Sequence, residues 1–293
     1  MNKSILISGW SIRKNSGISS VTISTALMMA LKNTDKKILW FTTSNNFCPI
    51  THSLAINCDK RIMGIDCVLD HLNPNNKDIY NDAIMDESLV HIKEVPNLSI
   101  LLESNTIDRD FIKDKGNYSR FKEFILPFFL EKYDIVVADI AGFLMSDVSL
   151  YMLKKSDLVI NILTQDSVLL DVYKQRAPEF ISRIKNRVNV INMVNDVQPD
   201  IRTIKKDYEK DLVEISYDNL FKSSCNMGYL YKYLTTEEHR VTKDITKLTD
   251  AICEIFNIQP PANSDTQIKK SKFPNFQLGK LFNHIISEGG GAQ

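Results

Sequence analysis

Residues 5–32, ILISGWSIRKNSGISSVTISTALMMALK, decide how this chain is interpreted. An apolar strand over Ile5–Ile7 runs into a polar loop that contains glycine, and the loop runs into a helix opened by Ser19 and Ser20. The first backbone N–H groups of a helix lack partners within the helix, and the helix dipole gives them partial positive charge. This order of strand, loop and helix therefore predicts a turn that binds phosphate.

The loop departs from the standard pattern G-x-x-x-x-G-K-[ST] at its lysine. Gly17 fits the second glycine and Ser19 fits the hydroxyl that ligates Mg²⁺, but Ile18 stands where the lysine belongs. Arg13 and Lys14 place cationic side chains inside the loop. Either of them is a candidate to reach back to the phosphates and partly replace the missing charge.

The composition is that of an ordinary globular protein, with 43% hydrophobic and 25% charged residues among 293. The formal net charge is zero, so no overall field favours nucleic acid or acidic lipid. Five scattered cysteines without a CxxC pair predict free thiols in a reducing compartment. No apolar run reaches the roughly 18 residues of a membrane-spanning helix. These features predict a cytoplasmic protein.

Continuous apolar runs separated by helical segments predict a sheet that is covered on both faces. Their alternation predicts a doubly wound, mostly parallel α/β fold with helices on both faces. The first predicted helix carries an amphipathic stripe, and Pro127 is expected to kink the second. The predicted strands are Ile5–Ser8, Lys37–Thr42, Leu98–Leu102, Asp134–Asp139, Leu158–Leu163, Val188–Val194 and Leu212–Ser216. The predicted helices are Ser19–Lys32, Phe121–Lys132, Ser167–Ile184 and Thr242–Phe256.

Asp139 is the second candidate for chemistry. It ends a predicted strand and is followed by a turn of small residues. This is the place of a Walker B aspartate, which holds Mg²⁺ directly or through water. An aspartate that only caps the end of the strand is the structural alternative.

The loop, Asp139 and the order of the strands together resemble the MinD/ParA superfamily of deviant-Walker P-loop ATPases over about residues 3–256. The resemblance implies ATP or ADP with Mg²⁺ as cofactors, with Ser19 and Asp139 at the metal. It also implies that Asn192 contacts the adenine base, and the alternative is a buried amide satisfied by loop backbone. The family loop K-G-G-x-G-K-[ST]-[ST], which binds nucleotide, lies over Arg13, Lys14, Asn15, Ser16, Gly17, Ile18, Ser19 and Ser20.

In this register Arg13 takes the place of the signature lysine, which reaches the partner's nucleotide across a dimer, and Lys14 takes it if the loop is shifted. Two departures from the family pattern predict weak or absent hydrolysis. Ile18 leaves phosphate charge less compensated, and the second strand ends in Thr42-Thr43-Ser44 where the family has a D-x-D carboxylate. A loop without the lysine is most similar to the TadZ/CpaE branch, whose members localise pilus secretion machinery.

The predicted organisation is a P-loop domain over residues 1–257, a flexible linker over 258–272 and an amphipathic tail over 273–293. Apolar residues at helical spacing define the tail, and lysines flank them. Its helix has three candidate docking sites: its own domain, a protein partner, or the membrane interface, where MinD-type proteins place a similar helix. The apolar tail residues are Phe273, Phe276, Leu278, Leu281, Phe282, Ile285 and Ile286.

These patterns predict a MinD/ParA-like positioning or assembly factor that binds ATP with weak or no hydrolysis. The resemblance implies a homodimer and protein partners, and a role in localising a membrane-associated machine such as a pilus or secretion system. The expected place is the cytoplasm, with peripheral contact at the inner face of the plasma membrane, and nucleic acid is not indicated. Two alternatives stay open: an active ParA-type ATPase in DNA partition, and a protein-interaction scaffold that needs no nucleotide.

Overall fold

The computed structural model describes thirteen stretches of the chain, and all of them belong to one structural unit, Met1–Ala262. The predicted amphipathic tail and most of the predicted linker lie outside the described residues, so the proposed division of the chain stays a prediction. Lys14 and Ser44 also lie outside them. The described residues are 3–13, 15–43, 50–56, 64–65, 67–68, 86–102, 115–140, 147–181, 184, 186–197, 199–207, 212–236 and 238–261.

Eight strands in the described stretches form one sheet in the order β3-β4-β2-β5-β1-β6-β7-β8. Neighbouring strands pair in parallel except for β3 and β4, which are antiparallel. This confirms the predicted doubly wound, mostly parallel α/β fold, and all seven predicted strands are present. The edge strand β3 was missed, because three residues carry too little pattern to predict a strand. The strands are β1 (Ile5–Trp10), β2 (Ile38–Thr42), β3 (Val90–Ile92), β4 (Val95–Leu101), β5 (Ile135–Asp139), β6 (Leu158–Thr164), β7 (Arg187–Val194) and β8 (Leu212–Ser216).

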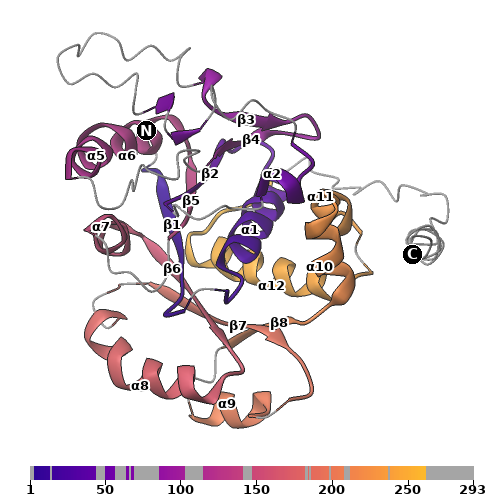
Figure 1. Cartoon of the computed structure of the whole chain (residues 1–293). Coiled ribbons are helices and arrows are strands. Elements are labelled where there is room, and N and C mark those ends of the chain that lie inside the picture. Colours follow the sequence, from indigo (N-terminus) through magenta and orange to yellow (C-terminus); the bar gives the residue numbers. More distant parts are fainter. Residues whose placement is uncertain are drawn as a thin grey trace, which may run out of the picture. The chain divides into compact units, whose positions relative to one another are not determined.

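Helices cover both faces of the sheet, and alternate residues of each strand face opposite layers. Ile7 of β1 packs in the core beneath α1, α11 and α12, whereas Leu6 packs in the core beneath α6 and α7 (Figure 1). No helix in the described stretches is long and apolar enough to cross a membrane. The helical elements are α1 (Ile18–Lys32), α2 (Ile50–Ser53), α5 (Lys115–Arg120), the π-helical turn η2 (Phe121–Ile125), α6 (Leu126–Lys132), α7 (Asp147–Lys155), α8 (Ser167–Ile181), α9 (Ile201–Asp207), α10 (Asn219–Asn226), α11 (Leu230–Leu234) and α12 (Arg240–Ile255).

Helix α1 is buried on all sides, so the predicted amphipathic stripe was wrong. All residues from Val21 to Ala30 are buried, including three hydroxyl side chains. The helix lies between the sheet and α12, and α2 and α11 also contact it (Figure 1). Two of these hydroxyls donate to carbonyls of the same helix, Thr22 to Ser19 at 3.2 Å and Thr25 to Val21 at 2.8 Å. The buried polar residues Thr22, Ser24 and Thr25 concealed the central position of α1.

The predicted helix Phe121–Lys132 is confirmed, with an irregularity at Pro127. The π turn η2 lies immediately before this proline, and α6 follows it. Proline has no N–H to donate to the preceding turn, so the regular bond cannot form there. The kink expected at Pro127 takes the form of a wider helical turn.

Candidate functional site

The loop after β1 lies where the sheet changes direction. β1 pairs with β5 on one side and with β6 on the other, and ligands of open α/β sheets bind beyond the carboxyl ends of the strands at this point. Asn15 and Gly17 have left-handed backbones, with φ of 63° and 83°. Gly17 is the N-cap of α1 and offers no side-chain acceptor to the first amides of the helix. This geometry suits an anion at the start of α1.

Gly9 allows α1 to lie close against β1. A Cβ at this position would lie 2.1 Å from the methyl group of Thr22, so any other residue would force Thr22 or α1 to move. The Thr22 hydroxyl accepts a hydrogen bond from Nε1 of Trp40 in β2 at 3.1 Å. The first turns of α1 are therefore anchored to the centre of the sheet, and this fixes Ser19 relative to the end of β5.

The structure brings Ser19 and Asp139 together, although 120 residues separate them in sequence. The Ser19 hydroxyl donates to Oδ2 of Asp139 at 2.5 Å. Asp139 is 2% exposed, and its own carbonyl accepts from the N–H of Thr43 at 2.9 Å. The two residues predicted at the metal thus form one hydrogen-bonded pair at the base of the loop, in which Asp139 is buried and Ser19 is half-buried.

This pair fits Mg²⁺ bound together with phosphate. In the described stretches, no group of three His, Cys, Asp or Glu side chains could hold a metal ion. Mg²⁺ does not need such a group, because it keeps several waters and binds through one or two carboxylates plus phosphate oxygens. The hydroxyl of Ser19 and the carboxylate of Asp139 are hard oxygen donors of the required kind.

The position of the loop lysine belongs to the hydrophobic core. Ile18 is 8% exposed and packs in the cluster beneath α1. At the neighbouring strand end, Thr42 and Thr43 are buried and provide hydroxyls where the family has a carboxylate. This part of the site supplies no charge of its own.

Ser20 faces α10 and contacts Cys225. A hydrogen bond from the Ser20 side chain lowers the pKa of the Cys225 thiol, but burial has the larger effect and raises that pKa to about 11. The thiol is therefore neutral at physiological pH. Cys225 was not among the predicted site residues, because nothing in its local sequence indicates that α10 contacts the first turn of α1.

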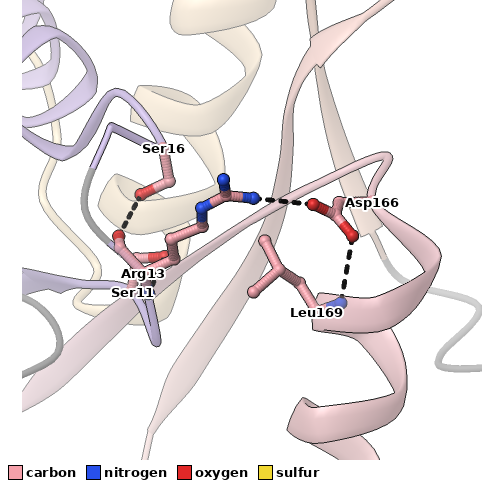
Figure 2. Close-up of polar contacts among 5 residues, drawn as sticks. All are labelled: Ser11, Arg13, Ser16, Asp166 and Leu169. Atoms are coloured by element: carbon pink, nitrogen blue, oxygen red, sulfur yellow. Dashed lines mark hydrogen bonds and ion pairs between the residues drawn. The ribbon is translucent and has the colours of Figure 1, made fainter.

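Arg13 is held by an acidic residue from another strand end. Its Nη1 lies 2.7 Å from Oδ2 of Asp166, which follows β6, and Figure 2 shows the pair beside the loop. The other carboxylate oxygen of Asp166 accepts from the N–H of Leu169 at 3.2 Å, in the first turn of α8. The Ser16 hydroxyl donates to the Arg13 carbonyl at 3.1 Å. Sequence reasoning missed Asp166, although an aspartate before a helix is a common N-cap.

Asn192 reaches the loop from β7. Its side-chain nitrogen donates to the carbonyl of Ser16 at 2.8 Å, and its side chain fills the space where Gly17 lacks a Cβ. The amide thus makes the loop-backbone contact that was the alternative to base recognition. The contact to adenine stays a prediction.

Neither a protein-family model nor a curated protein matches this chain. Solved structures do match it. A ParA family ATPase from Chlorobium tepidum TLS is 17% identical, with 85% of this chain and 98% of that chain covered at a TM-score of 0.65. The septum site-determining protein MinD of Pyrococcus horikoshii OT3, complexed with Mg-ADP, is 14% identical, with coverage of 87% and 98% and a TM-score of 0.66. A protein assigned to plasmid partition in Borrelia burgdorferi B31, bound to AMPPNP, is 19% identical, with coverage of 87% and 99% and a TM-score of 0.58.

This chain therefore has the fold of the ParA and MinD ATPases over nearly the whole length of those proteins. The predicted likeness to this superfamily is confirmed at the level of the fold. The narrower likeness to the TadZ/CpaE branch stays a prediction.

Proposed function

We propose that this protein binds a nucleoside di- or triphosphate with Mg²⁺ at the β1–α1 loop and acts as a positioning or assembly factor with weak or no hydrolysis. Ser19 and Asp139 would hold the metal, which neutralises phosphate charge when it is bound. The backbone amides from Gly17 onward would contact the phosphates. Similar chains with this fold were solved with Mg-ADP and with AMPPNP, which supports the choice of ligand.

The observation that carries this proposal is the hydrogen bond from Ser19 to the buried carboxylate of Asp139. A strand-end aspartate that only capped backbone amides would not need a hydroxyl from the first turn of α1. Burial of a carboxylate is costly unless the charge is paired or hydrogen-bonded. Here the carboxylate is aimed at the one hydroxyl that a phosphate-bound Mg²⁺ would also contact.

Slow or absent turnover follows from the charges around the loop. Catalysis of phosphoryl transfer depends on positive charge at the phosphates and on a positioned water. Ile18 provides no charge, and the guanidinium of Arg13 is already paired with Asp166. Binding through backbone amides and the metal remains available, whereas stabilisation of the transition state is reduced.

Calorimetry on the full chain tests the binding step. We expect saturable heats with ADP or ATP in the presence of Mg²⁺, and little binding when EDTA replaces Mg²⁺. Asp139→Asn keeps the shape of the side chain and should weaken Mg-nucleotide binding about tenfold or more, the size expected for losing a charged contact. Asp250→Asn, an exposed change on α12, is the matched control and should bind like the wild type. Absence of binding at millimolar nucleotide would leave only the scaffold alternative.

The role in positioning further requires a partner, and we propose a second copy of the chain across the loop face and a membrane-associated machine docked through residues 273–293. Deletion of residues 273–293, followed by liposome flotation and by size-exclusion chromatography with nucleotide, separates these contacts. Loss of flotation supports the membrane interface as the docking site. Unchanged flotation excludes it. Steady-state ATP hydrolysis stimulated by DNA would favour the alternative of an active partition ATPase.

A further inference from the structure

The side chain of Asn192 bonds directly to the backbone of the loop. Its Nδ2 donates to the Ser16 carbonyl at 2.8 Å, and the two residues are 6% and 2% exposed. A backbone carbonyl that is buried away from water needs a donor, and Asn192 supplies it. The contact joins the end of β7 to a loop that lies 176 residues earlier in the chain.

This contact also sets the direction of the next amide. The peptide between Ser16 and Gly17 is planar and trans, so its carbonyl and its N–H point in opposite directions. Because the Ser16 carbonyl points at Asn192, the Gly17 N–H points away from it. Loops that bind phosphate depend on N–H groups turned toward the anion. An amide side chain behind the loop can therefore hold a peptide in its binding orientation.

The end of β7 is shaped to deliver this side chain. Relative to β8, β7 has one extra residue between Ile191 and Val194, and Met193 has a left-handed φ of 62°. Bulges of this kind bend a strand, redirect side chains and are common beside active sites. Val190 packs in the core shared with α1, so Asn192, two residues later, faces the same side. A left-handed backbone is unfavourable for methionine, and the surrounding structure must hold it in place.

We infer that Asn192 is a positioning residue that holds the Gly17 N–H toward bound phosphate. This inference rests on the proposed function for the phosphate site, but it assigns Asn192 to the phosphate end of the ligand. The resemblance to MinD and ParA proteins assigns it to the base. The two roles differ in the ligands whose affinity they affect, because inorganic tripolyphosphate has phosphates and no base.

The test compares Asn192→Ala with Asn189→Ala in the full chain. Asn189 is a buried amide on the same strand, 4% exposed, and its Oδ1 accepts a hydrogen bond from Nδ2 of Asn161 on the neighbouring strand at 2.8 Å. Two quantities are measured for each variant: the ¹⁵N-resolved amide signal of Gly17 without ligand, and the affinities for Mg-ATP and Mg-tripolyphosphate. Asn189→Ala reports the effect of losing a buried amide in general.

We expect Asn192→Ala to move the Gly17 signal and to weaken ATP and tripolyphosphate by the same factor, about three- to tenfold. Asn189→Ala should leave all three values unchanged even if it lowers the melting temperature. An unmoved Gly17 signal, unchanged affinities, or a loss confined to ATP would each overturn the inference. If the wild type binds neither ligand, the proposed function fails, and the Gly17 signal alone then decides whether Asn192 orients the peptide.

Discussion

The two sides of the candidate site differ in which groups of a standard phosphate-binding site they contain. On the metal side, the half-buried Ser19 donates a short hydrogen bond to the buried Asp139 at the junction of α1 and β5. On the charge side, Ile18 is part of the core, Thr42 ends β2 and Thr43 follows it, and neither threonine provides a carboxylate. The same sheet positions the residues of both sides, so the two sides differ in the chemistry of their side chains.

This difference shows that binding and turnover have separate structural requirements. A metal pair and backbone amides suffice to hold a phosphate, since both interact with the ground state. Hydrolysis requires charge and water placed for the transition state. Under the proposed function, a site that keeps the first set and lacks the second would sense a nucleotide rather than consume it.

The largest expected effect comes from Gly17→Ala, because both sides of the site depend on the left-handed turn that Gly17 makes at the start of α1. The residue has φ of 83°, and a Cβ would overlap the side-chain nitrogen of Asn192. We expect nucleotide binding to be lost and the free energy of unfolding to fall by about 1–3 kcal/mol. Calorimetry and urea denaturation measure the two effects. Gly116→Ala, an exposed change within α5, is the control and should stabilise the fold by at most about 1 kcal/mol.

Ile18→Lys adds the missing cation and tests whether the charge side limits the affinity for phosphate. A charge-assisted bond to phosphate should tighten Mg-ATP about tenfold or more and raise the preference for ATP over ADP. Because Ile18 is 8% exposed, loss of its packing should cost about 1–2 kcal/mol of stability, partly offset by the aliphatic part of lysine. Ile18→Met separates the packing effect from the charge. Unchanged ATP affinity in a folded Ile18→Lys protein would show that Ile18 does not face the phosphates.

Asp166→Asn breaks the ion pair with Arg13 and tests whether the freed guanidinium contacts the bound phosphates. Their side chains are 34% and 57% exposed, so the pair contributes at most about 1 kcal/mol to stability. The stability change should therefore be small, whereas a freed Arg13 should tighten Mg-ATP severalfold. The double variant Arg13→Ala with Asp166→Asn should remove that gain. A gain that persists in the double variant would assign it to Asp166 alone.

The smallest effect concerns Cys225 in α10, next to Ser20 in the first turn of α1. Burial raises the pKa of this thiol to about 11. The raised pKa favours the neutral thiol in the folded protein. The stabilisation of the fold by the neutral thiol is therefore complete below about pH 9 and is lost as the pH rises toward 11. Alkylation of Cys225 by iodoacetamide, followed by mass spectrometry from pH 7 to 10, should be slow compared with a peptide of the same sequence. Ser20→Ala should slow it further, and equal rates would contradict the packing of Ser20 against α10.

The fold was largely predictable, because continuous apolar strands and the order of motifs leave few topologies. The pairing of Ser19 with Asp139 also followed, since parallel strands bring their carboxyl ends to one edge of the sheet. The roles of Asp166, Cys225 and the bulge at Met193 did not follow, because each depends on a contact between elements distant in sequence. Local patterns report which face of an element is apolar, and they do not report which neighbour lies against it.

A single-turnover experiment tests the central claim most directly. Protein in excess over labelled ATP is incubated with Mg²⁺, separated from free nucleotide on a desalting column, and the retained label is identified. The account predicts that label is retained only with Mg²⁺ and is recovered as ATP after many minutes. Recovery as ADP, or no retention with Mg²⁺ at protein concentrations that saturate the calorimetric signal, would contradict it.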